Sequence, residues 1–288
     1  MAEAEVRPRT AATGDSVMKL HRHSVRLDGR SYTVITLRLD ADVRFSSNRF
    51  HETWHVISDE AGAKTLARLL WGLAYQRHPG TFVLIDRAHL APNPFDAEPA
   101  DPIVLLPSHL TALTRQAAKA LRGQPPTKPD GTVRWRTHGL DTRVAEYREW
   151  RDMPDGQREY PYTPEPAGWE TVERIGGVLV LAGGPQTLRQ WATYADLMRI
   201  VAPWDTDYEY LADREGEIQI FLNYRREVAI AKHARADILS APHPADIPQL
   251  REHIWRRAAQ IRAQQTGNAD ERSVTGPESR TRGGNFGR

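Results

Sequence analysis

The sequence predicts a mixed α/β or α+β protein, in which helices flank a mixed sheet that includes two β-hairpins. Short apolar runs of strand length alternate along the chain with amphipathic segments of helical period. Residues typical of tight turns lie between segments in which apolar residues alternate, as expected for β-hairpins. Both ends are too polar to bury a core, so we expect them to be disordered. The chain has 288 residues, which is enough for one large or two small domains.

Composition excludes several classes of protein. There is no cysteine, so disulfide frameworks, thiol catalysis and cysteine-ligated metals are excluded. Hydrophobic residues make up 40% and charged residues 26%, which is typical of a globular protein. No run of apolar residues is long enough to cross a membrane, and the first residues lack the apolar core of a secretory signal. We therefore expect a cytoplasmic protein with no membrane partner.

The first half of the fold is expected in residues 18–151, after a disordered segment at residues 1–17. Asp28-Gly29 predicts a type I′ hairpin turn, because both positions of that turn need positive φ. An extended run from Phe50 to Ile57 follows, and Ser58 is the expected N-cap of a helix. The apolar stripe of that helix consists of Leu66, Leu69, Leu70, Leu73 and Ala74.

A buried strand is predicted at residues 82–85, followed by a loop rich in proline and acidic residues. Ser108 is the expected cap of a second helix. A strand around Trp135 and a short polar helix complete this half. Four prolines then make residues 152–168 the best candidate for a linker or connector.

The second half is expected in residues 169–263 and begins with a strand at residues 177–181. Gly183-Gly184 ends that strand, and Pro185 suits the first turn of the next helix. A hairpin follows, with Tyr208 on one arm and Ile218 on the other. Residues 226–239 fit either a strand or a helix, residues 247–263 form an amphipathic helix, and residues 264–288 read as a disordered tail.

One short motif suggests an enzyme. His51-Glu52-Thr53-Trp54-His55 matches H-E-x-x-H and so resembles the active-site helix of zinc metallopeptidases over five residues. In that alternative, His51 and His55 bind Zn²⁺ and Glu52 is the general base of a hydrolase. The surrounding alternation favours a strand instead, in which the two histidines would lie about 13 Å apart. No third ligand follows at a familiar spacing.

Two other groups could hold a ligand next to a strand. His21 and His23 can share one strand face, where they could join the later histidines in a metal site. Asp86 and His89 follow the strand at residues 82–85, and ligands of α/β sheets bind at the carboxyl ends of strands. The acidic side chains in the loop that follows could support a hydrated Mg²⁺; they are Asp96, Glu98 and Asp101.

Two signals suggest a phosphate group or a nucleic acid. Gly183 and Gly184, between a strand and a helix, could expose backbone N–H groups to a phosphate, although neither standard phosphate-loop spacing is present. Residues 251–288 contain eight arginines and four acidic residues. Arg256, Arg257 and Arg262 in the last helix could therefore contact the phosphates of a nucleic acid.

A non-catalytic binding or regulatory protein is the function that the sequence favours, because no catalytic set combines the required spacing with supporting context. Its partner could be another protein or a small polar ligand. Aromatic residues near the linker offer a contact surface or a packed connector; they are Tyr147, Trp150, Tyr160, Tyr162 and Trp169. A zinc-dependent hydrolase and a nucleic-acid-binding protein are the alternatives.

Overall fold

The computed structural model describes residues 17–159, 161–163, 165–244 and 246–274, with side chains up to residue 265. It divides into two compact units. Within the described ranges, unit 1 comprises the residues up to Asn93 and Glu98–Arg225, and unit 2 comprises Pro94–Ala97 and the residues from Arg226 onward. The disorder predicted for residues 1–16 and 275–288 lies outside the described residues.

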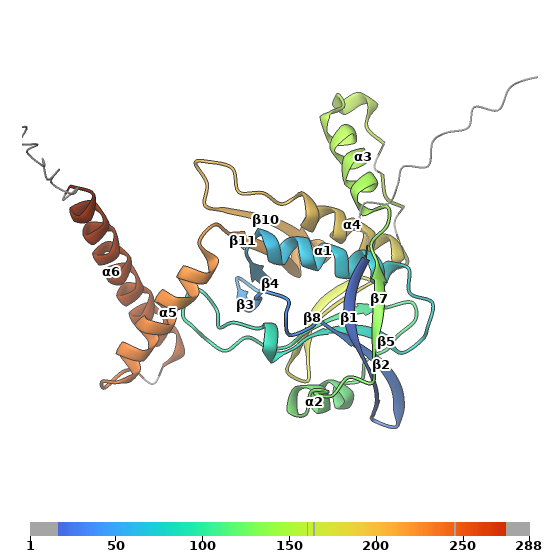
Figure 1. Cartoon of the computed structure of the whole chain (residues 1–288), viewed down its shortest axis with the longest axis horizontal. Coiled ribbons are helices and arrows are strands. Elements are labelled where there is room, and N and C mark those ends of the chain that lie inside the picture. The colour runs from blue at the N-terminus through green and yellow to red at the C-terminus, as the bar shows by residue number, and fades with distance from the viewer. Residues whose placement is uncertain (1–16, 160, 164, 245, 275–288) are drawn as a thin grey trace, which may run out of the picture. The chain divides into compact units, whose positions relative to one another are not determined.

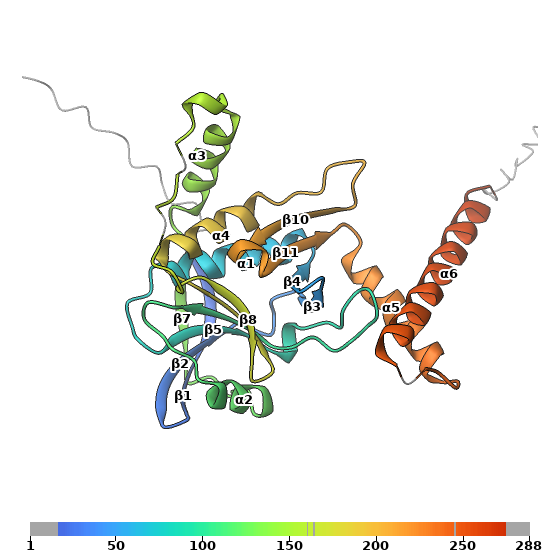
Figure 2. The same ribbon diagram turned by 180° about the vertical axis from the view of Figure 1, so that it is seen from behind.

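A seven-stranded mixed sheet is the centre of unit 1 (Figures 1 and 2). Its order is β7-β1-β2-β5-β6-β9-β8, with β2 parallel to β5 and β6 parallel to β9. The other neighbours are antiparallel. The strands are β1 (Val17–Leu27), β2 (Arg30–Thr36), β5 (Thr81–Ile85), β6 (Ile103–Pro107), β7 (Gly131–Arg136), β8 (Thr171–Ile175) and β9 (Val178–Gly183).

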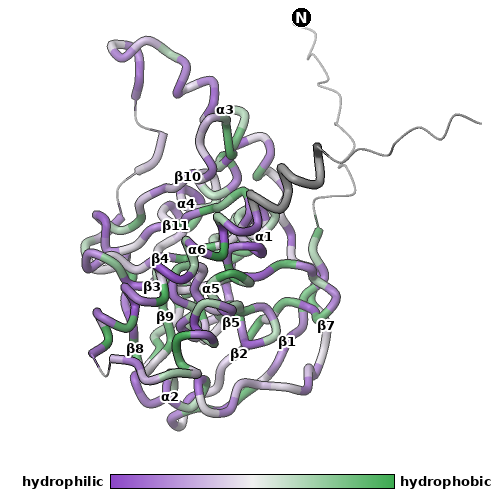
Figure 3. Tube along the Cα trace, turned by 90° about the vertical axis from the view of Figure 1, so that its left-hand side faces the viewer, coloured by the Kyte–Doolittle hydropathy of each residue, from purple (hydrophilic) through white to green (hydrophobic). Residues whose placement is uncertain are grey.

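Both faces of this sheet are covered, which explains the continuous apolar runs of its central strands. Because side chains alternate along a strand, Phe82 and Leu84 face α2 (Arg115–Gly123), whereas Val83 and Ile85 face the larger core. That core contains α1 (Glu60–Ala74) and α4 (Pro185–Leu197), which run side by side in both views. In Figure 3 the peripheral loops are mainly hydrophilic.

A four-stranded mixed sheet packs on the same core. Its order is β10-β11-β4-β3, formed by β3 (Ser46–Phe50), β4 (Thr53–Ser58), β10 (Thr206–Leu211) and β11 (Gly216–Phe221). Val56 of β4 and Ile218 of β11 lie in the core cluster that also holds α1. The helices α1 and α4 therefore contact strands of both sheets. The remaining elements of unit 1 are α3 (Leu140–Asp152) and three 3₁₀ turns, η1 (Arg87–His89), η2 (Asp155–Gln157) and η3 (Ala212–Arg214).

Unit 2 is a helical hairpin. It is formed by α5 (Tyr224–Leu239), whose first two residues belong to unit 1, and α6 (Ile247–Val274). Apolar residues of both helices share one cluster, which includes Ile230 and Ile254. Glu227 pairs with Arg262, and Asp237, ten residues later in α5, pairs with Arg257, five residues earlier in α6, so the two helices are antiparallel. None of the helices in the described residues is long and apolar enough to span a bilayer.

The predicted fold class is confirmed, since both sheets are mixed and helices flank them. The turn at Asp28-Gly29 has positive φ at both residues, as a type I′ turn requires. The five stripe residues of α1 are buried. Residues 226–239, which were ambiguous, are helical.

Several boundaries differ from the prediction. The N-cap of α1 is Asp59, whose side chain accepts a hydrogen bond from Gly62 N–H, while Ser58 ends β4. Thr114, not Ser108, caps α2. The strands β6 and β8 were not predicted. The α6 backbone stays helical past residue 263 to Val274, so part of the predicted disordered tail is helical.

The predicted connector at residues 152–168 lies between parts of one sheet. Strands β8 and β9 follow it in the chain, and β9 pairs with β6 of the preceding half. The two predicted halves, residues 18–151 and 169–263, thus share the seven-stranded sheet, and the division between compact units falls at Arg225 and Arg226 instead.

Candidate functional site

A pocket of about 770 Å³ lies at the carboxyl ends of β2 and β5. These two strands are adjacent and parallel, so their ends, and the loops that follow, meet at one edge of the sheet. We call this cavity the β2–β5 pocket. It is lined by His21, His23, Thr36, Leu37, Leu39, Asp86, Arg87, Ala88, Gly123, Gln124, Pro125, Pro126, Thr127 and Pro129.

The pocket brings together two groups that the sequence suggested separately, the histidines of β1 and the residues after β5. The imidazole of His23 is satisfied, since Nδ1 donates to the carbonyl of Lys128 and Nε2 accepts from the Thr36 hydroxyl, both at 3.1 Å. His21 differs: its Nδ1 is buried and has no hydrogen-bond partner among the described residues.

Asp86 and His89 have different roles at this pocket. The carboxylate of Asp86 accepts a hydrogen bond from Ala88 N–H at 3.1 Å and so caps η1. His89 is buried, its Nε2 donates to the carbonyl of Arg38 at 3.0 Å, and its Nδ1 lies 3.7 Å from Asp86. Asp86 lines the pocket, whereas His89 fixes the turn behind it.

The acidic side chains of the following loop are engaged by arginines. Asp101 accepts two hydrogen bonds from the guanidinium of Arg174, at 2.5 and 3.1 Å. Within unit 2, the carboxylate of Asp96 lies 3.1 Å from Arg251 Nε. Two of the three carboxylates proposed to support Mg²⁺ are thus already neutralised, and nothing in the geometry favours a cation here.

Two positive charges at this edge of the sheet have no acidic partner. The guanidinium groups of Arg87 and Arg122 make no hydrogen bond or ion pair with any residue that the structure describes. Arg87 follows β5 directly and lines the β2–β5 pocket. Sequence analysis overlooked both arginines, because their charge is available only if no acidic residue reaches them.

The H-E-x-x-H motif forms the turn and second strand of a hairpin. His51 and Glu52 have φ of 47° and 69°, so they occupy the turn between β3 and β4, and His55 lies in β4. The helical face that would hold zinc is therefore not formed. Within the described ranges, no group of three or more His, Asp and Glu side chains is placed to hold a metal ion.

His55 has a different partner, which the sequence did not reveal. Strands β4 and β11 are parallel neighbours, and their register pairs His55 with Glu217. His55 Nδ1 lies 3.7 Å from Glu217 Oε1, and both side chains are mostly buried. Burial lowers the pKa of His55 and raises the pKa of Glu217 to about 7, since it disfavours the charged form of each group.

The helix N-terminus after Gly183 and Gly184 already holds an anion from this chain. The carboxylate of Glu165 accepts hydrogen bonds from the backbone N–H groups of Gln186 and Thr187, at 2.8 and 3.1 Å. A carboxylate is favoured at the first turn of a helix, because the free N–H groups point toward it. Gly184 leaves room for this contact, since a Cβ at this position would overlap both carboxylate oxygens. The predicted phosphate position is thus filled by Glu165.

The arginines proposed to bind nucleic acid are likewise paired in unit 2. Arg256 pairs with Glu252, four residues earlier in α6. Arg257 pairs with Asp237 at 2.7 Å, and Arg262 with Glu227 at 2.7 Å, so two of the three link α6 to α5. Their charge is partly neutralised within the hairpin, which weakens the case for binding phosphates.

The aromatic residues near the connector pack largely on one another and on α4. Tyr147 contacts Trp150, Tyr162 and Tyr194, with ring centroids 4.9 to 6.3 Å apart. Tyr162 is buried, and its hydroxyl donates to Thr193 at 2.7 Å. Trp169 stacks on His109, and Tyr160 lies outside the described residues. The alternative of a packed connector accounts for most of this group.

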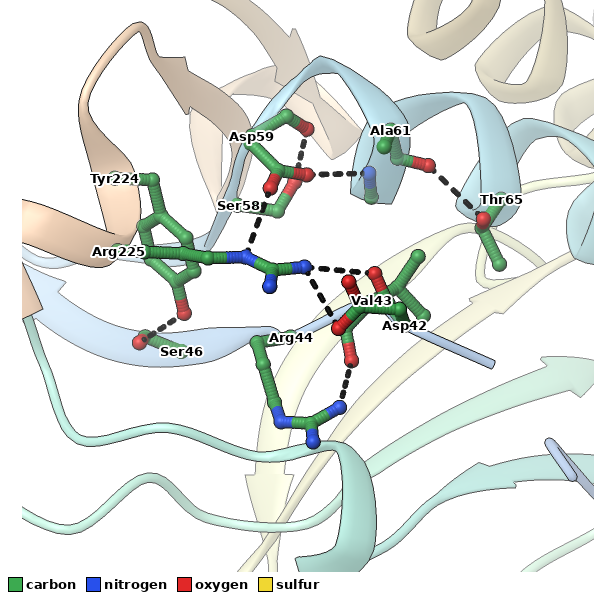
Figure 4. Close-up of polar contacts among 11 residues, drawn as sticks. Asp42, Val43, Arg44, Ser46, Ser58, Asp59, Ala61, Thr65, Tyr224 and Arg225 are labelled. Carbon is green, nitrogen blue, oxygen red and sulfur yellow. Dashed lines mark hydrogen bonds and ion pairs between the residues drawn. The ribbon is translucent and has the colours of Figure 1, made fainter. Parts of the chain in front are cut away.

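A polar cluster at the start of α5 was also not predicted from the sequence (Figure 4). The Tyr224 hydroxyl lies 2.7 Å from Ser46 Oγ, and both residues are buried. Arg225 pairs with Asp42 at 3.0 Å and with Asp59, the cap of α1, at 3.6 Å. Burial raises the pKa of Tyr224 to about 12. These contacts link β3 and the cap of α1 to the first two residues of α5.

Comparison of the chain with protein-family models, with curated proteins and with solved structures finds no match. The function must therefore be argued from the geometry of the pockets and from the charges that face them.

Proposed function

We propose that the protein binds a small anionic molecule in the β2–β5 pocket and acts as a binding or regulatory protein. The observation that carries this proposal is the unpaired guanidinium of Arg87 on the wall of the pocket. The volume of about 770 Å³ falls in the range of small-molecule sites.

The surroundings of Arg87 favour an anion with an apolar part. Three prolines and two leucines contribute apolar surface to the walls. The carboxylate in the lining, that of Asp86, is used in capping η1. An anionic group of the ligand would pair with Arg87 by charge-assisted hydrogen bonds.

The proposal is tested with 1-anilinonaphthalene-8-sulfonate, which joins an aromatic body to one negative charge. Its fluorescence on binding is titrated at low ionic strength in the wild type, in Arg87→Ala and in Arg26→Ala. Arg26 is the matched control, because it is exposed on β1 and lines neither pocket at this edge of the sheet.

Loss of a charge-assisted pair costs about 1.5–3 kcal/mol, so we expect Arg87→Ala to raise Kd by roughly 10- to 100-fold. Arg26→Ala should leave Kd unchanged. Ala88→Trp, which places a large side chain in the lining, should also weaken binding while the urea midpoint stays near that of the wild type. Equal dye affinity in the wild type, Arg87→Ala and Ala88→Trp would contradict the proposal.

A further inference from the structure

Arg87 also lines a second, smaller pocket of about 370 Å³. The two cavities therefore adjoin at its side chain. We call the smaller one the two-arginine pocket, because Arg122 lines it as well. Its lining consists of Arg87, Leu90, Ala91, Pro92, Pro99, Ala100, Asp101, Pro102 and Arg122.

The two arginines reach this pocket from different elements. Arg87 opens η1 after β5, and Arg122 lies in the last turn of α2. The Arg122 side chain crosses the turn between β8 and β9 at Gly177, where a Cβ would come within 2.5 Å of Cδ and 2.7 Å of Nη1. Gly177 has φ of 87°, so both its conformation and its lack of a side chain leave this path open to Arg122.

The charge that faces the two-arginine pocket is strongly positive. Asp101 is the one acidic residue of its lining, and both oxygens of its carboxylate are bonded to Arg174. Neither Arg87 nor Arg122 has an anionic partner in the part of the chain that the structure describes. Two guanidinium groups at one small cavity favour the binding of a compact anion with more than one negative charge.

We infer that the two-arginine pocket takes a phosphoryl group, so that the ligand is a phosphomonoester whose organic part lies in the β2–β5 pocket. This inference rests on the proposed function, since it assigns the class of the anion. A phosphomonoester carries a charge of about −1.5 to −2 at pH 7 and three terminal oxygens, which match two planar guanidinium groups. A carboxylate has one charge and two oxygens, and it would leave one arginine without a partner.

The test compares phenyl phosphate with benzoate by isothermal titration calorimetry at pH 7.5. The proteins are the full-length wild type, Arg87→Ala, Arg122→Ala and the control Arg115→Ala. Arg115 is exposed at the other end of α2 and lines neither pocket. Urea midpoints show whether each variant is folded.

We expect the wild type and Arg115→Ala to bind phenyl phosphate at least tenfold more tightly than benzoate. Arg122→Ala should abolish this preference while changing benzoate affinity less than twofold, and Arg87→Ala should weaken both ligands. Lowering the pH from 7.5 to 5 should reduce the preference in the wild type, because the phosphate becomes a monoanion.

The outcomes separate the inference from the proposed function. If benzoate binds through Arg87 but phenyl phosphate binds no more tightly, the two-arginine assignment is overturned and the proposed function stands. An equal loss of both ligands in Arg122→Ala also overturns the assignment. If Arg87→Ala changes the affinity for neither ligand and leaves the affinity for the dye unchanged, both the inference and the proposed function are refuted.

Discussion

The buried pair of His55 and Glu217 makes a quantitative prediction about pH. Burial lowers the pKa of His55 and raises that of Glu217 to about 7, so it favours the neutral form of each group in the folded protein near pH 6. In the unfolded chain at that pH, the histidine is mostly charged and the carboxyl group is ionised. The pair thus holds one proton in either state, on Glu217 when folded and on His55 when unfolded.

The two residues therefore act on stability with opposite signs. Glu217 keeps a proton that the unfolded chain has released, so its contribution is full below pH 4.5 and is lost as pH rises to about 7. The loss is about 1.4 kcal/mol per pH unit, or about 3 kcal/mol in total. His55 remains unprotonated when the unfolded chain takes up a proton, so it reduces stability as pH falls below 6.5 toward its lowered pKa. Where these intervals overlap, the two effects cancel.

Single substitutions should reveal the pH dependence of the free energy of unfolding that each residue contributes. In His55→Gln the free energy of unfolding should fall as pH rises through 5.0–6.5, by up to about 1.4 kcal/mol per unit relative to the wild type. In Glu217→Gln it should rise with pH in the same interval. Urea unfolding followed by tryptophan fluorescence at a series of pH values measures both. Slopes equal to that of the wild type would refute the neutral pair.

Two further substitutions test contacts elsewhere in unit 1. Gly184→Ala should displace the carboxylate of Glu165 from the first turn of α4 and lower the free energy of unfolding by about 2–4 kcal/mol, because two charge-assisted hydrogen bonds are lost; an unchanged urea midpoint would argue against this contact. Ser46→Ala should cost about 1–3 kcal/mol, because the buried hydroxyl of Tyr224 loses its partner. Combining Ser46→Ala with Tyr224→Phe should cost less than the sum of the two single changes, and strict additivity would show that the hydroxyls do not interact.

Local patterns predicted those elements whose signals lie within a few residues. The Asp28-Gly29 turn, the apolar stripe of α1 and the Pro185 start of α4 are examples, and each was found. Helix caps were less predictable, because neighbouring residues can perform the same role. Ser58 precedes Asp59 and is held in β4 by its pairing with Ile220 of β11, which leaves the cap to Asp59. The apolar segment that forms β6 is bordered by prolines, so the sequence did not indicate a strand there.

The candidate site was predicted only in part, since it depends on contacts between distant residues. The rule that ligands lie at the carboxyl ends of strands pointed to Asp86, which does line the β2–β5 pocket. It could not indicate that Arg174 would bind Asp101 and leave Arg87 without a partner. In the same way, the pairing of β4 with β11, and not the H-E-x-x-H spacing, gives His55 its neighbour.

The parallel pairing of β6 with β9 has a practical consequence for work with fragments. A chain cut within residues 152–168 would yield two pieces, each with one edge of the seven-stranded sheet uncovered. Both edges are long apolar runs, Ile103–Pro107 and Val178–Gly183, and such edges recruit strands from other chains. Either fragment alone should aggregate, whereas the two produced together should reassemble, because each supplies the strand that the other lacks.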